Sequence, residues 1–228
     1  MRIAFCVSGV PRSGIGQSEK IHENFHRNRK SHARAFPSAD FYYGTWNEYE
    51  EIVKNSFPDD SIVSFEEPAI DYHPFYDISP EFMWSERLVK IVPKYKTIKD
   101  HRQDRYIHQT KQILCHAYLI DHFNLKEKYD IIIRARYDTY ISHQANFQRF
   151  LDDVNKNPKA VGFALLRDNN FDQIKTIPKD APNGKRFLFD SLIIHSSKIF
   201  DTKEVYKLNS TQNLLPCEFG WFQTMSYP

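Results

Sequence analysis

The sequence lacks the features that mark several classes of protein. Its 228 residues contain no apolar run close to the ~20 residues that a membrane-spanning helix needs. Its 7 glycines and 12 prolines follow no period, which excludes a collagen-like or low-complexity chain. Aromatic residues are abundant instead. The 18 Phe and 13 Tyr, within 41% hydrophobic residues, exclude extensive disorder and can supply a folded core.

Cysteine is scarce, and neither sign of charge dominates. Cys6, Cys115 and Cys217 lie far apart and form no CxxC pair, so we expect neither a zinc ribbon nor a disulfide framework. The opening MRIAFCVSGVPRSG passes from a short apolar run into a Pro-Arg turn, unlike a signal peptide. A net charge of +2 argues neither for nor against an anionic partner. We therefore expect a cytoplasmic protein with buried thiols.

Strands and helices are predicted to alternate along the chain. Strands are expected at Arg2–Ser8, Phe41–Trp46, Ser61–Phe65, Asp130–Arg136, Ala160–Leu166 and Phe187–His195. Helices are expected at Gln17–Phe36, after Asn47 (with Glu50 completing a capping box), and at Glu81–Lys90, Gln103–Phe123, Asn146–Asn155 and Ser197–Leu208. Long loops are expected at Glu66–Pro80 and Arg167–Arg186. This alternation predicts one α/β domain, residues 1–228, with a central, mostly parallel sheet and helices on both faces.

The first candidate site is the loop Ser8-Gly9-Val-Pro-Arg12-Ser-Gly14, which directly follows the first strand. In an open α/β sheet, this loop lies at the carboxyl edge, where ligands bind. Glycine lets the backbone approach a ligand closely, and Arg12 suits a phosphate. The loop therefore indicates a phosphate or nucleotide site, although its spacing matches no Walker loop and a tight turn with a solvated arginine would look the same.

The second candidate is Arg134-Ala-Arg136-Tyr-Asp138, at the end of a strand with three consecutive isoleucines. Such an apolar strand is typical of a sheet buried on both faces. The strand period of two places Arg134 and Arg136 on one face, if the strand runs that far. Asp138 falls just beyond the strand, where a carboxylate could hold a divalent ion. An Arg–Asp ion pair that closes the strand is the alternative interpretation.

Two further candidates are less specific. Trp46 at the end of the second strand could pack beside a base or sugar, and it could equally be a core residue. Asp190 lies in an apolar strand and could act as a general base, an acceptor anchor or a structural partner. His195 in the same strand is interpreted first as a core residue and second as a ligand. Glu218 is a similar late acid.

The segment HENFHRNRKSHAR is basic, and its His22 and His26 have the i,i+4 spacing of metal ligands. We interpret it as a solvated helix face. It lacks the aromatic platform of an RNA-binding surface, and acids elsewhere offset its charge, so no nucleic-acid partner is expected.

Three blocks in this order resemble a group of glycosyltransferase-like proteins with a GT-A-type fold, common in large viruses, phages and polysaccharide gene clusters. The blocks are Ile3–Arg12, Ala39–Asn47 and Tyr129–Asp138. The resemblance implies a nucleotide-sugar donor and a glycan acceptor, with residues 1–140 as the donor half and 141–228 as the acceptor half. The donor would be bound by Ser8, Gly9, Arg12, Trp46, Arg134 and Arg136.

The resemblance also implies roles for three acids and a histidine. Asp138 would hold Mn²⁺ or Mg²⁺, with waters or His195 completing the shell. Tyr140 stands where many GT-A enzymes carry a second acid, which puts strict metal dependence in doubt. Asp190 is expected to take the proton of the acceptor hydroxyl in an inverting transfer, with Glu218 as the next candidate.

A sulfotransferase and a non-catalytic nucleotide-binding module are the alternatives. The loop from Gly9 to Gly14 is also similar to a 5′-phosphosulfate loop, and Arg134, Asp138 and Ser142 reproduce the spacing of a 3′-phosphate site. Ile15-Gly16 replaces the threonines expected after that loop, and the Thr-Trp-Asn block finds no role in this interpretation.

Overall fold

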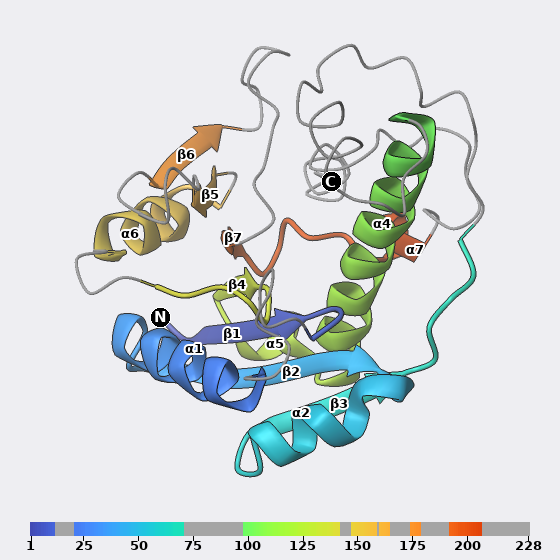
Figure 1. Ribbon diagram of the computed structural model, residues 1–228. Coiled ribbons are helices and arrows are strands. Elements are labelled where there is room, and N and C mark those ends of the chain that lie inside the picture. Colours follow the sequence, from blue (N-terminus) through green and yellow to red (C-terminus); the bar gives the residue numbers. More distant parts are fainter. Residues whose placement is uncertain are drawn as a thin grey trace.

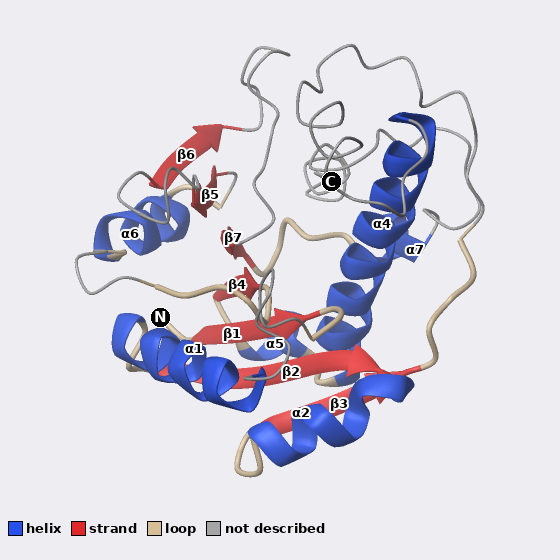
Figure 2. Cartoon of the chain, viewed as in Figure 1, coloured by secondary structure: helices blue, strands red, loops and turns tan. Residues whose placement is uncertain are grey.

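The computed structural model describes residues 1–11, 21–70, 98–141, 147–158, 160–164, 174–178 and 192–206 (Figures 1 and 2). The strands are β1 (Ile3–Ser8), β2 (Ala39–Trp46), β3 (Ser61–Phe65), β4 (Ile131–Ala135), β5 (Ala160–Ala164), β6 (Ile174–Pro178) and β7 (Leu192–Ser196). The α-helices are α1 (Ile21–Ala35), α2 (Glu50–Ser56), α4 (Ile98–His122), α5 (Leu125–Lys128), α6 (Gln148–Lys156) and α7 (Thr202–Tyr206).

All described strands belong to one sheet with the order β3-β2-β1-β4-β7-β5-β6. β1 is parallel to β2 and β4, and β2 is parallel to β3. β7 is antiparallel to both β4 and β5, and β6 is antiparallel to β5. Strands β1 to β5 therefore run in one direction and β6 and β7 in the other, which confirms the predicted α/β fold with a mostly parallel central sheet.

Helices cover both faces of this sheet, as predicted. On one face, side chains of α1, α2 and α6, such as Phe25, Val53 and Val154, share a core with Phe5 and Ile133 of the sheet. On the other face, α4, α5 and α7 pack on the alternate residues of the same strands. The long α4, green in Figure 1, stands away from the blue α1. None of the described helices combines the length and the apolar composition needed to span a bilayer.

Burial explains why the central strands were predictable. Every residue of β1 and β4 is buried, so their apolar runs face helices on both sides. The helices show the complementary stripe: in α6, Leu151 and Val154 are buried, three residues apart on one face. Cys6 and Cys115 are buried free thiols, as expected, while Cys217 lies outside the described residues.

Two local predictions were wrong, and one helix was missed. β6 lies inside the expected loop Arg167–Arg186, at the edge of the described sheet beside β5, and ends at Pro178, where a missing N–H is tolerated. The capping box at Asn47 is absent, because a 3-10 turn occupies Asn47–Tyr49 and α2 begins at Glu50 without a side-chain cap. The short helix α5 was not foreseen. The predicted helix Glu81–Lys90 lies outside the described residues.

Candidate functional site

The carboxyl ends of β1 and β4 border the point where the sheet changes its direction of winding. The chain continues from β1 to α1 on one face, whereas it reaches β4 from α4 on the opposite face. These two strands are neighbours, with Val7 opposite Ala135 at their carboxyl ends. In open α/β sheets, ligands bind in the crevice at such a topological switch point. Ser8, Gly9 and the segment from Arg134 to Asp138 all lie there.

Gly9 lies at this edge of the sheet, hydrogen-bonded to β2 and close against α4. Its φ of 111° lies in the region that favours glycine. Its N–H donates to the Gly44 carbonyl at 3.1 Å, and its carbonyl accepts from Thr45 Oγ1 at 3.2 Å. A Cβ at this position would lie 3.2 Å from Cγ of Gln112 in α4. The glycine thus lets the loop turn directly against helix α4.

The neighbouring Ser8 and Arg134 are polar groups inside the protein. Ser8 is 2% exposed, and its hydroxyl has no hydrogen-bond partner among the described residues. Arg134 is fully buried on the α4 face, where its Nη2 donates to Oε1 of Gln112. A buried guanidinium keeps its charge and requires polar partners. Gln112 therefore joins Arg134 to the helix that packs against Gly9, a link that the sequence analysis missed.

Burial also sets the protonation of the groups around Arg134. It raises the pKa of the Cys115 thiol to about 12, so this cysteine is a neutral thiol near pH 7. It lowers the pKa of His116 well below the usual value, and the electrostatic interactions with His195 and Arg134 add to the shift. His116 is therefore neutral as well, and the guanidinium of Arg134 is the charged group of this trio.

Arg136 and Asp138 form a two-pronged ion pair just beyond β4. Arg136 Nε lies 2.8 Å from Asp138 Oδ1, and Nη2 lies 2.5 Å from Oδ2. A turn closes around the pair, since Thr139 N–H donates to the Arg136 carbonyl at 3.1 Å. Both side chains keep some exposure, 26% for Arg136 and 19% for Asp138. The ion pair named as the alternative is thus present at the carboxyl edge of the sheet.

The described residues do not form a ready-made divalent-cation site. Both carboxylate oxygens of Asp138 accept hydrogen bonds from Arg136. Within the part of the chain that the structure describes, no group of three or more His, Cys, Asp or Glu side chains could hold a metal ion. A cation at Asp138 would need the ion pair to open.

His195 is not brought to Asp138. It pairs with Ile132, three residues before the end of β4, so it lies about 10 Å back along the sheet from that end. Its ring is fully buried between His116 and Phe200, with centroids 6.0 and 5.5 Å away. Burial lowers its pKa to about 4. The structure thus places His195 in the core, the first of the two sequence interpretations, and one ion cannot be held by both residues.

Trp46 is also a core residue in the structure. It is fully buried, and its ring meets Tyr118 of α4 edge-on with centroids 6.4 Å apart. Its indole Nε1 has no hydrogen-bond partner among the described residues. A role of Trp46 toward a base or sugar stays a prediction, as do the roles of Arg12, Asp190 and Glu218, which lie outside the described residues.

A row of polar side chains on α1 supports the segment from Tyr137 to Ile141, which contains Asp138. Asn28 Nδ2 donates to the Tyr137 carbonyl at 2.8 Å, and His32 Nε2 lies 2.8 Å from the Thr139 carbonyl, which makes that nitrogen the donor. Arg34 Nη2 donates to the Ile141 carbonyl at 2.7 Å. The sequence analysis took this helix for a solvated basic face. That holds for the exposed His22 and His26, whereas the opposite face is buried and polar.

Comparisons with known proteins leave the family open. No protein-family model matches the chain, and no curated protein matches its sequence. Among solved structures, it is similar to 4-diphosphocytidyl-2C-methyl-D-erythritol synthase from Anaerococcus prevotii, with 10% identity and a TM-score of 0.41 over 97% of this chain and 83% of that one. It is also similar to mouse xyloside xylosyltransferase 1 in its apo form, with 10% identity and a TM-score of 0.41 over 98% and 80%. Such distant likenesses do not say what this chain binds, so the function has to be argued from its own residues.

Proposed function

We propose that the protein is a glycosyltransferase of the GT-A type, which moves a sugar from a nucleotide-sugar donor to a hydroxyl of a glycan or other acceptor. The observation that supports this most is the gathering of Ser8, Gly9, Arg134, Arg136 and Asp138 at the topological switch point of the sheet. The sequence blocks that carry these residues resemble the same class of enzyme. A diphosphate is the chemical group that this crevice would suit best.

Each of these residues has a simple part in binding a diphosphate. Gly9 brings backbone close to the ligand without a side chain between them. The buried hydroxyl of Ser8 can donate to a phosphate oxygen. Arg136, partly exposed at the strand end, can offer charge-assisted hydrogen bonds to the phosphates. The buried Arg134 adds a fixed positive charge from the α4 face of the sheet. On the acceptor side, Asp190 is proposed as the base that takes the hydroxyl proton, with Arg12 on the donor and Glu218 as the alternative base.

Donor binding is the first test. A nucleoside diphosphate at about 100 times its dissociation constant is expected to stabilise the fold by about 2.7 kcal/mol, because it binds only the native state. For a chain of this size, that raises the melting temperature by about 5–10 °C. Thermal-shift measurements with UDP, GDP, CDP and ADP would show it, while adenosine 3′,5′-bisphosphate is expected to give no shift. A shift with the bisphosphate alone would favour a sulfotransferase, and no shift with any nucleotide would contradict the proposal.

The chain offers a matched control for the arginine in this test. Arg29 and Asp60 form the same two-pronged ion pair, at 2.8 and 3.0 Å, close to the amino ends of β2 and β3. Arg136→Gln is expected to weaken nucleotide binding ~10-fold or more, the usual value of a charge-assisted hydrogen bond. Arg29→Gln removes an equivalent pair away from the crevice and should leave nucleotide affinity unchanged. Equal losses in both variants would mean that Arg136 acts on the fold only.

Divalent-ion dependence is a separate prediction. Because Asp138 is engaged by Arg136, an ion can bind it only together with phosphate oxygens that take over the arginine. Mn²⁺ and nucleoside diphosphate are therefore expected to bind cooperatively in the wild type. Asp138→Ala should abolish this coupling, and Asp60→Ala should preserve it. Calorimetric titration of each protein with nucleotide, in the presence and absence of Mn²⁺, measures this coupling. If the wild type binds the nucleotide equally well with and without Mn²⁺, the arginines bind the diphosphate without a metal.

A further inference from the structure

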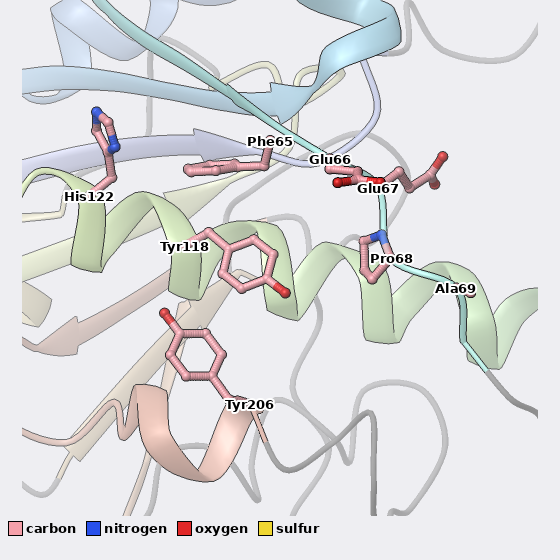
Figure 3. A pocket seen from close by; sticks show the side chains of 8 residues that line it. All are labelled: Phe65, Glu66, Glu67, Pro68, Ala69, Tyr118, His122 and Tyr206. Carbon is pink, nitrogen blue, oxygen red and sulfur yellow. The ribbon is translucent and has the colours of Figure 1, made fainter.

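A groove of about 620 Å³ lies on the α4 side of the sheet, beyond the carboxyl end of β3 (Figure 3). Figure 3 shows Phe65 and the segment that follows it along one wall, Tyr118 of α4 at the centre and Tyr206 of α7 along the other wall. The described lining consists of Phe65, Glu66, Glu67, Pro68, Ala69, Tyr118, His122 and Tyr206. Its volume falls within the range of small-molecule sites.

The three aromatic rings in the groove, those of Phe65, Tyr118 and Tyr206, are held in place by contacts with one another and with neighbouring residues. The ring of Tyr118 lies 5.3 Å from Phe65 and 5.4 Å from Tyr206, centroid to centroid. The buried Trp46 supports Tyr118 edge-on, and the Tyr206 hydroxyl donates to Asp121 of α4. Burial raises the pKa of Tyr118 above its ordinary value, so its hydroxyl stays protonated. The groove therefore presents fixed aromatic faces with hydroxyl groups, and little side-chain entropy is lost when a ring stacks on them.

The charge of the groove selects among ligands that stack on aromatic rings. Its described lining includes Glu66 and Glu67 and has neither lysine nor arginine. Lys111 Nζ lies 2.9 Å from Glu67 Oε1 and compensates the charge of that carboxylate, whereas the Glu66 side chain is exposed. Carboxylates accept strong hydrogen bonds from hydroxyl or ammonium groups and repel phosphate. The groove is thus unsuited to the anionic donor and suited to a neutral or amino-bearing polyol.

Helix α4 contributes to both the groove and the candidate site. Its Lys111 pairs with Glu67, and the next residue, Gln112, accepts a hydrogen bond from Arg134 and lies close to Gly9. The groove itself requires nothing from the crevice to bind such a polyol.

We propose that this groove binds a saccharide, neutral or amino-bearing, by stacking on Tyr118 and Tyr206 and by hydrogen bonds to Glu66. The identification of that saccharide as the acceptor rests on the proposed function. The pyranose ring offers apolar C–H groups to the aromatic faces and hydroxyl groups to the carboxylate. Saccharide binding is expected without nucleotide.

Three tetrasaccharides of different charge test the proposal: β-1,4-linked glucosamine, its N-acetylated form and α-1,4-linked galacturonate. Saturation-transfer NMR and calorimetry on the whole chain without nucleotide are expected to show binding of the first two, with the galacturonate at least ~10-fold weaker. Tyr118→Ala and Tyr206→Ala should each weaken binding ~10-fold, while Tyr206→Phe, which keeps the ring, should stay within ~2-fold. The glucosamine tetramer is expected to bind more tightly than its N-acetylated form because its ammonium groups face Glu66, and Glu66→Gln should abolish this preference. Glu127→Gln on α5 is the charge control, expected to change nothing.

Several results would overturn the proposal. These are no binding of any tetrasaccharide, equal binding of the galacturonate, or unchanged binding in both alanine variants with a native melting temperature. Spermine binding as tight as that of the glucosamine tetramer would identify a cation site instead. The nucleotide-induced rise in melting temperature is measured separately. Saccharide binding without that rise would support the saccharide groove and contradict the proposed glycosyltransferase function. A rise in melting temperature without saccharide binding would support the proposed function and contradict the saccharide groove.

Discussion

The free energy of unfolding is expected to fall steeply as the pH decreases from about 6.5 to about 4, because the fold buries neutral histidines. Burial lowers the pKa of His32 to about 4, and the positive charge of Arg29 contributes, against the opposing hydrogen bond to Thr139. His195 has the same low pKa for the same main reason. Below pH 6.5 the unfolded chain binds protons that the folded chain rejects, so stability is lost as the pH falls through this window.

The expected loss is large. A difference of one pKa unit corresponds to about 1.4 kcal/mol, so each of these two histidines accounts for about 3 kcal/mol between neutral pH and pH 4. Urea unfolding measured at intervals from pH 7.5 to pH 4 would give the slope. A decline well below this size would mean that the two rings are hydrated in solution.

One histidine can be separated from the other by substitution. His32 stacks on Phe5 with centroids 4.6 Å apart and donates to the Thr139 carbonyl, on the opposite face of the sheet from His195. His32→Gln retains a donor and removes the titrating ring, so it should remove this histidine's share of the pH dependence, about 3 kcal/mol over the window, while costing some stability at pH 7. His26→Gln, on the exposed face of α1, is the control for the loss of an imidazole and is expected to keep the wild-type slope.

The central strands were predictable because they follow from local sequence. β1 and β4 are buried on both faces, and such strands are apolar along their whole length. The edge strand β6 carries no comparable signal, because IKTIP is short and part polar and, among the described strands, pairs with β5 on one side only. Pairing between segments distant in the chain is invisible to a local pattern.

The positions of Arg134 and Arg136 at the end of β4 were predictable, and their contacts were less so. The strand period placed Arg134 and Arg136 on one face, yet β4 ends at Ala135, and the two arginines have different surroundings. Arg134 is buried against Gln112, 22 residues earlier, whereas Arg136 binds Asp138 in its own turn. The polar row of α1 was missed because its partners are backbone carbonyls about 107 to 109 residues away, which composition cannot reveal.

Replacement of Gly9 is expected to affect both stability and nucleotide binding. An alanine at this position would be held at a φ of 111°, a conformation that costs about 1–3 kcal/mol for a residue with a Cβ. Its Cβ would also lie 3.2 Å from Gln112 Cγ, so Gln112 and its bond to Arg134 would have to shift. Gly9→Ala should therefore lower the free energy of unfolding by about 2 kcal/mol or more, measured by urea titration.

Gly44 provides the control that separates backbone strain from crowding. A Cβ on Gly44 would lie 3.2 Å from Cβ of Leu119, which belongs to α4 like Gln112, so it would approach the helix as closely as a Cβ on Gly9. Unlike Gly9, Gly44 does not have a positive φ. Gly44 touches the site through its backbone carbonyl, which accepts the Gly9 N–H, but a Cβ on Gly44 would face Leu119, so Gly44→Ala introduces crowding against α4 without strain at Gly9. If Gly9 lets a diphosphate approach the backbone, Gly9→Ala should lose the nucleotide-induced rise in melting temperature, while Gly44→Ala retains it at comparable stability. Retention of the full rise in both variants would mean that Gly9 shapes the turn against α4 without contacting the donor.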